Sequence, residues 1–120
     1  MKHTPLLALF ALAACTSVVA APTGPAGFGQ VTAVETLQIR PLALLEDSRC
    51  PASVQCVWAG QVRIRVEIMS RSGREVRELT LGNPIAVAGG TLTLVEVEPP
   101  KVAPGTTDSR QYRFAFRFER

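Results

Sequence analysis

Histidine is almost absent from this sequence, because the one histidine of the chain is His3, close to the N-terminus. Closed zinc sites use four ligands, mainly cysteine and histidine, and histidine is the commonest general base in enzymes. If the first residues are removed as an export signal, the remaining chain contains no histidine. The composition therefore argues against a zinc site and against histidine-dependent catalysis, and we expect no metal and no cofactor.

Cysteine is also scarce, with three residues at positions 15, 50 and 56. A catalytic redox pair favours a Cys-x-x-Cys spacing and a reactive thiol at a helix N-terminus, whereas five residues separate Cys50 from Cys56 and no helical pattern follows. We therefore favour a structural disulfide between them. In the chain-entropy model, closing so short a loop stabilises the fold by roughly 2 kcal/mol.

The charge balance lacks a strong basic excess. Thirteen basic residues face ten acidic residues, for a net charge of +3. Nucleic-acid-binding domains usually gather a pronounced basic excess on one face, so we expect no nucleic-acid partner. Internal repeats and low-complexity tracts are absent as well.

The N-terminus has the pattern of an export signal. Lys2 precedes an apolar run of nine residues, LLALFALAA, at positions 6–14. This run is too short to cross a bilayer as a helix, which needs about 20 residues. The sequence Leu12-Ala13-Ala14-Cys15 resembles the lipobox of bacterial lipoproteins.

The lipobox resemblance implies a signal at residues 1–14 and a lipid on Cys15, which would attach the protein to a membrane. Thr16 in the following position implies an outer-membrane, periplasmic location by the sorting rule of such lipoproteins. Ordinary cleavage after Ala20, with residues 1–20 as the signal and a soluble periplasmic or secreted product, is the alternative. Both cleavage sites leave Cys50 and Cys56 as a pair, so the number of cysteines does not decide between lipidation and ordinary cleavage.

Residues 15–29 are small, rich in proline and glycine and almost uncharged. This composition predicts a flexible tether, with a first strand over residues 17–21 as the alternative. Residues 30–120 are then one domain of about 90 residues, a size at which an exported protein is often stabilised by a disulfide.

Apolar residues alternate with polar ones over much of this domain, which is the pattern of half-buried strands. We predict strands over residues 62–69, 76–81, 91–98 and 110–120, with turns between them. The change of parity between Leu94 and Val95 predicts a bulge or a strand covered on both faces. Residues 31–39 and 42–46 are expected as two strands or one strand broken at Pro41, with a helix over residues 41–47 as the alternative. The predicted fold is all-β, a small antiparallel sandwich or barrel-like domain.

The two paired cysteines lie in a compact motif, DSRCPASVQCVWAG, at residues 47–60. It resembles the signature D-S-R-C-P-x-x-V-x-C-x-W-A-G of an uncharacterised family of small bacterial exported proteins, which are often lipoproteins. The matching positions are Asp47, Ser48, Arg49, Cys50, Pro51, Val54, Cys56, Trp58, Ala59 and Gly60. This resemblance implies export and a β-rich fold, and it brings no catalytic residues.

Asp47, Arg49 and Trp58 are the candidate interaction residues of this motif. Asp47 and Arg49 have two possible roles: to stabilise the turn through local hydrogen bonds, or to form a recognition loop for an anionic or peptide ligand. Trp58 has the strand parity of Cys56, which places its indole beside the predicted disulfide.

No catalytic residue set emerges from the sequence, and we expect a protein that is not an enzyme. The remaining carboxylate pairs, Glu46 with Asp47 and Glu96 with Glu98, fit a solvated face better than an active site. The favoured function is a non-catalytic envelope lipoprotein that binds an envelope protein or peptide. One alternative is an inhibitor of an exported hydrolase, with Arg49 at the lip of the closed loop. Another is a basic patch for acidic glycans or lipid head groups, formed by Arg63, Arg65, Arg113 and Arg117.

The lipid anchor can be tested directly at Cys15. Each buried methylene of an acyl chain contributes roughly 0.8 kcal/mol to membrane binding, so the loss of the acylated residue should release the protein. We expect palmitate to label the native chain, and the Cys15→Ser variant to leave the membrane fraction. A Cys15→Ser variant that stays in the membrane would exclude this anchor.

Overall fold

The computed structural model describes residue 11 and residues 21–120. Cys15 and all of the predicted signal except residue 11 lie outside the described residues, so processing and lipidation stay predictions. Within the described part of the chain, no helix has both the length and the apolar character needed to cross a membrane.

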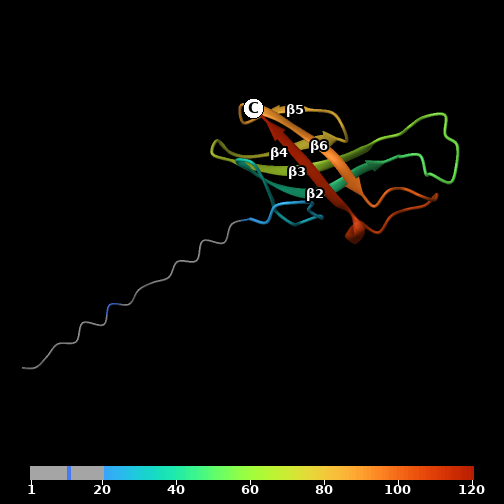
Figure 1. Ribbon diagram of the computed structural model, residues 1–120, viewed down its shortest axis with the longest axis horizontal. Coiled ribbons are helices and arrows are strands. Elements are labelled where there is room, and N and C mark those ends of the chain that lie inside the picture. Colours follow the sequence, from blue (N-terminus) through green and yellow to red (C-terminus); the bar gives the residue numbers. More distant parts are fainter. Residues whose placement is uncertain (1–10, 12–20) are drawn as a thin grey trace, which may run out of the picture.

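The domain consists of two antiparallel sheets that face each other (Figure 1). The first sheet has the order β1-β2-β3-β4 and the second has the order β5-β6-β7. A short 3-10 helix, η1, precedes the last strand. The elements are β1 (Thr32–Val34), β2 (Leu37–Asp47), β3 (Val62–Ser70), β4 (Gly73–Thr80), β5 (Ile85–Val87), β6 (Gly90–Glu98), η1 (Ser109–Gln111) and β7 (Arg113–Glu119). The all-β prediction is confirmed.

The core lies between the two sheets and comes from the alternating apolar positions. On β3, the inward side chains are buried while their neighbours face solvent, as expected from the two-residue period of a strand. Phe114 of β7 is completely buried against this layer. The central residues of the core are Leu37, Ile39, Val62, Ile64, Val66, Ile68, Leu79, Leu92, Leu94, Tyr112, Phe114 and Phe118.

Strand β2 runs without a break through Pro41, so residues 41–47 do not form the alternative helix. Pro41 lacks an N–H group, and its carbonyl accepts a hydrogen bond from Gly29 N–H at 2.8 Å. The backbone polar groups of Pro41 therefore face away from the ladder with β3, which explains why a proline is tolerated there. Register shifts at Pro41/Ala43 and Leu44/Glu46 accommodate the irregular apolar pattern.

The predicted bulge in β6 is present at Val95. Leu94 pairs with Phe116 and Glu96 pairs with Ala115, so Val95 is the extra residue. It is partly exposed, whereas Leu94 before it and Val97 after it both reach the core. The extra residue thus allows the side chains of both Leu94 and Val97 to point into the core, although they differ in strand parity.

Residues 22–29, which the composition placed in a flexible tether, are attached to both sheets. Ala26 pairs with Phe114 through hydrogen bonds of 3.0 and 2.9 Å, and Ala33 N–H donates to Pro22 O at 2.8 Å. The ring of Phe28 packs edge-on against Phe114 with a centroid distance of 5.0 Å. Small residues allow this close approach, so the segment covers the free edge of β7 and extends the domain before residue 30.

The Phe28→Ala substitution tests whether this segment belongs to the fold. Removal of a partly buried ring from two aromatic neighbours should lower the free energy of unfolding by about 2 kcal/mol, measured by urea denaturation. Val76→Ala, at an exposed position of β4, is the control and should change it little. Equal stability of the Phe28→Ala variant and the native chain would mean that residues 22–29 are a free tether.

Candidate interaction site at the disulfide loop

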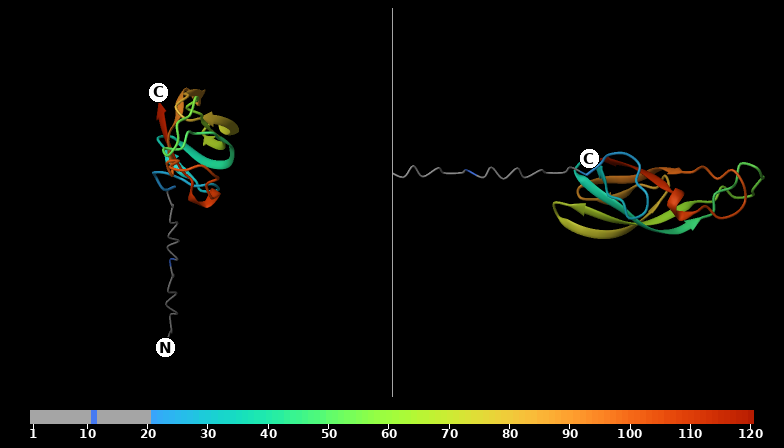
Figure 2. Two further views of the ribbon diagram at one scale, coloured as in Figure 1. Left: turned by 90° about the vertical axis from the view of Figure 1, so that its right-hand side faces the viewer. Right: turned by 90° about the horizontal axis from the view of Figure 1, so that it is seen from below.

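Two long connections meet at one end of the sandwich (Figures 1 and 2). Residues 48–61 join β2 to β3, and residues 99–108 join β6 to η1. Ala52 N–H donates to Lys101 O at 2.9 Å, and Ser53 N–H donates to Val102 O at 3.1 Å. The two loops therefore form one continuous surface.

The first loop is closed at its base by covalent and backbone contacts. Cys50 and Cys56 form a disulfide with a Cα–Cα distance of 5.9 Å, as predicted. Ser48 N–H donates to Gln61 O at 2.8 Å, and Cys50 N–H donates to Ala59 O at 3.3 Å. These contacts fix the path of the chain from β2 into β3.

Gly60 is required at this base for two reasons. Its φ of +70° lies in the left-handed region that side chains with a Cβ rarely adopt. A Cβ atom at this position would also overlap the backbone of Ser48. The glycine that ends the motif thus has a structural cause.

Asp47, Arg49 and Tyr112, which we name the Asp47 cluster, form a network at the root of the loop. The Arg49 guanidinium contacts both carboxylate oxygens of Asp47, with Nε–Oδ1 at 2.9 Å and Nη2–Oδ2 at 3.0 Å. The Tyr112 hydroxyl donates to Asp47 Oδ2 at 2.6 Å. The side chains of Asp47 and Arg49 are only 7% and 16% exposed. The cluster joins the end of β2 to the start of β7, and thus one sheet to the other.

Further contacts extend this network to β6 and the second loop. Arg49 Nη1 donates to Val97 O at 3.4 Å, and Lys101 Nζ donates to Asp47 O at 3.4 Å. The loop is therefore held from both sheets.

The electrostatics of the Asp47 cluster favour a permanent ion pair. The hydrogen bonds from Arg49 lower the pKa of Asp47 to about 2, against the opposing effect of burial. The same contact raises the pKa of Arg49. Burial, followed by the hydrogen bond to Asp47, raises the pKa of Tyr112. At neutral pH the carboxylate and the guanidinium are charged and the phenol is neutral, which suits a structural role better than proton transfer.

The three predicted interaction residues have different environments in the structure. Asp47 and Arg49 face inward and bind each other, which fits the structural alternative. Trp58 is 80% exposed and Val57 is 89% exposed. The expected position of the indole beside the disulfide depended on strand parity, but residues 57–60 form no strand, so the parity of Cys56 does not determine where Trp58 points.

The structure contradicts one further hypothesis from the sequence, the basic patch, and agrees with another, the solvated face of Glu96 and Glu98. Arg63 and Arg65 lie on β3, whereas Arg113 and Arg117 lie on β7 in the other sheet, so they do not form one basic patch. Arg63 instead contacts Glu78 at 3.2 Å. Glu96 and Glu98 are both exposed on β6, as on a solvated face.

Sequence reasoning missed the contribution of Tyr112, which lies 65 residues from Asp47. Its place in the alternating run of β7 indicated only a core aromatic. It also missed the apolar side chains of the loops, because Val54, Val57 and Val102 carry no local signal of exposure.

Among the described residues, no three histidine, cysteine, aspartate or glutamate side chains gather as a metal ion would require. Comparison of the chain with protein-family models, with curated proteins and with solved structures gave no match. The resemblance of residues 47–60 to a family signature therefore stays a prediction.

The contribution of the Asp47 cluster can be measured by Asp47→Asn. The pKa shift from 3.8 to about 2 corresponds to about 2 kcal/mol of stability from the ionised carboxylate. Because the folded state lowers this pKa, the stabilisation is complete above pH 4 or so and is lost as the pH falls towards about 2. We expect Asp47→Asn to lower the free energy of unfolding at pH 7 by about 2 kcal/mol, and this difference from the native chain to shrink in acid.

Asp108 and Arg110 provide a matched control, because they form the same bidentate Asp-x-Arg pair with distances of 3.2 and 2.8 Å. Arg110 is 88% exposed, so solvent screens this pair. Asp108→Asn should leave the stability unchanged. Equal effects of the two substitutions in urea denaturation between pH 2 and 7 would contradict the special role of the Asp47 cluster.

Proposed function

We propose that this chain is a non-catalytic, lipid-anchored module of the bacterial cell envelope that binds another protein. The contact surface is the apolar tip, which we define as Val54, Val57, Trp58 and Val102. The observation that carries this proposal is the exposure of Val57 and Trp58 on a loop whose base is tightly held.

The apolar tip has the composition of a protein-binding surface. Burial of a large apolar side chain contributes roughly 1.5–3 kcal/mol, so a partner that covers the tip would gain from each of its members. Tryptophan is among the residues most often found at the energetic centre of interfaces. The tip combines one tryptophan with three valines from two adjacent loops.

The fixed base of the loop favours binding for a second reason. A flexible loop loses conformational freedom when it binds, and this loss weakens the complex. The disulfide, Gly60 and the Asp47 cluster order the loop in advance. Ordering therefore takes place during folding rather than on binding.

The absence of a catalytic set supports a binding role. Within residues 21–120 the sequence has no histidine. The carboxylate of Asp47 is bound by Arg49 and Tyr112. None of Asp47, Arg49 and Tyr112 has a pKa shifted towards neutrality. They suit a scaffold rather than acid–base chemistry.

The position of Ala21 fits an anchored module. The N-terminal segment, drawn in blue, joins the domain on the side away from the disulfide loop (Figures 1 and 2). A lipid on Cys15 would therefore leave the apolar tip pointing away from the membrane, towards a periplasmic partner. Soluble processing after Ala20 would present the same tip without an anchor.

The alternative, inhibition of an exported hydrolase, has less support. It placed Arg49 at the lip of the loop to enter a protease cleft, but Arg49 turns inward to Asp47. An inhibitor would have to use Val57 and Trp58 instead, and a protease recovered as the partner would reveal this.

The test is crosslinking of the full chain in its own envelope, followed by recovery of the attached proteins. We expect one or more defined partners with the native chain and their loss with Trp58→Ala or Val57→Ser. Both positions are so exposed that the midpoint of thermal unfolding should stay unchanged.

Val76→Ala removes an exposed apolar side chain far from the loop, on β4, and should retain the partners. Identical crosslinked proteins in the native, Trp58→Ala and Val57→Ser samples would refute the apolar tip as the contact surface.

A further inference from the structure

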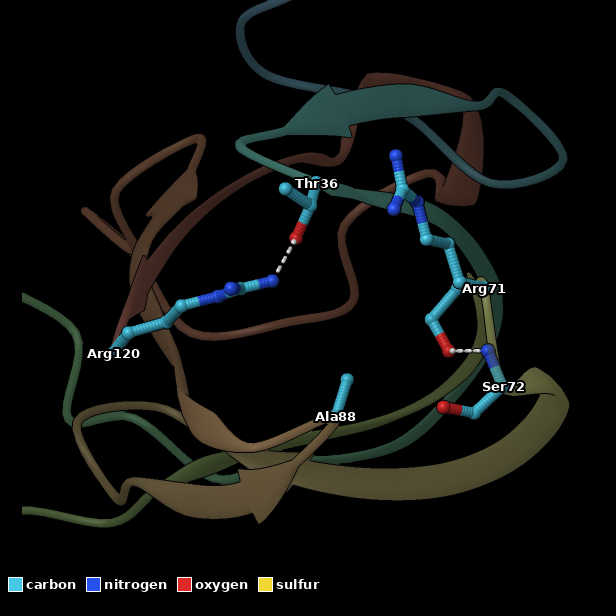
Figure 3. A pocket seen from close by; sticks show the side chains of 6 residues that line it. Thr36, Arg71, Ser72, Ala88 and Arg120 are labelled. Carbon is cyan, nitrogen blue, oxygen red and sulfur yellow. Dashed lines mark hydrogen bonds between the residues drawn. The ribbon is translucent and has the colours of Figure 1, made fainter.

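A hollow of about 340 Å³ lies at the end of the sandwich opposite the apolar tip. Four segments contribute to it: the turns that precede β2, β4 and β6, and the end of β7. Figure 3 shows the hollow from close by. Its lining consists of Thr36, Ser70, Arg71, Ser72, Ala88 and Arg120, and we name it the arginine hollow.

Two guanidinium groups extend into the arginine hollow from opposite walls (Figure 3). Arg71 comes from the turn between β3 and β4, and Arg120 follows β7. Arg120 Nη2 donates to Thr36 Oγ1 at 3.4 Å, which directs this side chain across the opening. None of the lining residues is acidic.

Three glutamates of the strands around the hollow contact arginines that do not line it, and one of them is Glu75, which lies 3.9 Å from Arg77. Glu67 contacts Arg40 at 3.5 Å and Arg74 at 3.8 Å, and Glu119 contacts Arg117 at 3.1 Å. Among the described residues, no aspartate or glutamate side chain lies within 4.0 Å of the guanidinium of Arg71 or Arg120. Two positive charges therefore share one hollow, and an anion between them would relieve their repulsion.

The hydroxyl groups of the hollow are also set to donate. Ser70 Oγ accepts a hydrogen bond from Ser72 N–H at 3.2 Å, and Thr36 Oγ1 accepts from Arg120. A hydroxyl that accepts with its oxygen still has its own hydrogen to give. Two guanidinium groups and three hydroxyls thus line one hollow as available donors, and a ligand with several acceptor oxygens would satisfy some of them.

We propose that the arginine hollow binds a phosphate group. Phosphate has the charge and the acceptor oxygens that this donor set lacks, and arginine forms bidentate contacts with it. Such a group exists free in solution and in phospholipid head groups. This inference goes beyond the proposed function, because it concerns the end of the domain that the apolar tip does not reach.

The position of the hollow makes a lipid head group a natural source of the phosphate. In the right-hand view of Figure 2, the N-terminal segment joins the domain in the half that also holds the labelled C-terminus. Residues 16–21 would connect a lipid on Cys15 to Pro22, and six residues span at most about 20 Å. An anchored domain would therefore hold the arginine hollow near the membrane surface.

Phosphate titration of the Cys15→Ser full chain tests the site without any acyl chain. The probe is inorganic phosphate, with sodium chloride at equal ionic strength as the salt control, and backbone amide shifts of residues 36 and 70–72 are the readout. We expect saturable shifts with phosphate, and binding about tenfold weaker in Arg71→Gln or Arg120→Gln, since a charged hydrogen bond contributes about that factor.

Arg74→Gln is the matched control, because Arg74 lies near the hollow but contacts Glu67. It removes one positive charge and should leave phosphate binding within about twofold, because Arg74 does not line the arginine hollow and its charge is paired with Glu67. Shifts that do not saturate, that chloride reproduces, or that persist in the Arg71→Gln/Arg120→Gln double variant would overturn the proposal.

Vesicles then identify the source of the phosphate. The Cys15→Ser chain is floated with phosphatidylglycerol vesicles, and phosphatidylcholine vesicles are the control. A lipid head group is supported if this chain binds phosphatidylglycerol vesicles and its Arg71→Gln/Arg120→Gln double variant does not. Phosphate binding without vesicle binding supports a free phosphate compound. Loss of the crosslinked partner in Trp58→Ala bears only on the apolar tip, so the two proposals fail separately.

Discussion

The carboxylate of Asp47 is the contact on which the rest of this structure depends. It receives Arg49 from the adjoining loop and Tyr112 from the start of β7, so one charged group joins both sheets and the connection between them. A buried ion pair is favourable only when its geometry is good and its remaining polar atoms are satisfied. Here the bidentate pair and the phenol meet that condition, and no buried side-chain polar atom of the described residues lacks a partner.

Much of the fold could be predicted because its strands are regular. The alternation on β3 and β7 identifies the inward residues, and the parity change at Val95 identifies the bulge. Pro41 gave an ambiguous signal, since its effect depends on which side of β2 its backbone faces. Composition alone also could not show that Ala26 pairs with Phe114, because this contact depends on a partner far along the chain.

The candidate site was less predictable than the fold. The spacing of Cys50 and Cys56 is a local signal, and it indicated the disulfide. The partner of Asp47 on β7 and the exposure of Trp58 depend on tertiary packing, for which no short pattern exists. The domain thus has two ends of different chemistry, apolar at the disulfide loop and cationic at the arginine hollow.

The attachment of residues 22–29 has a mechanical consequence. Tension applied at Ala21 first loads the hydrogen bond between Ala33 and Pro22, then the bond from Thr32 Oγ1 to Gly24 O, and then the two bonds between Ala26 and Phe114. These few bonds lie at the margins of the sheets, so they would yield before the longer ladders of β2, β3 and β4 are disturbed. Under load we therefore expect this segment to detach before the main ladders separate.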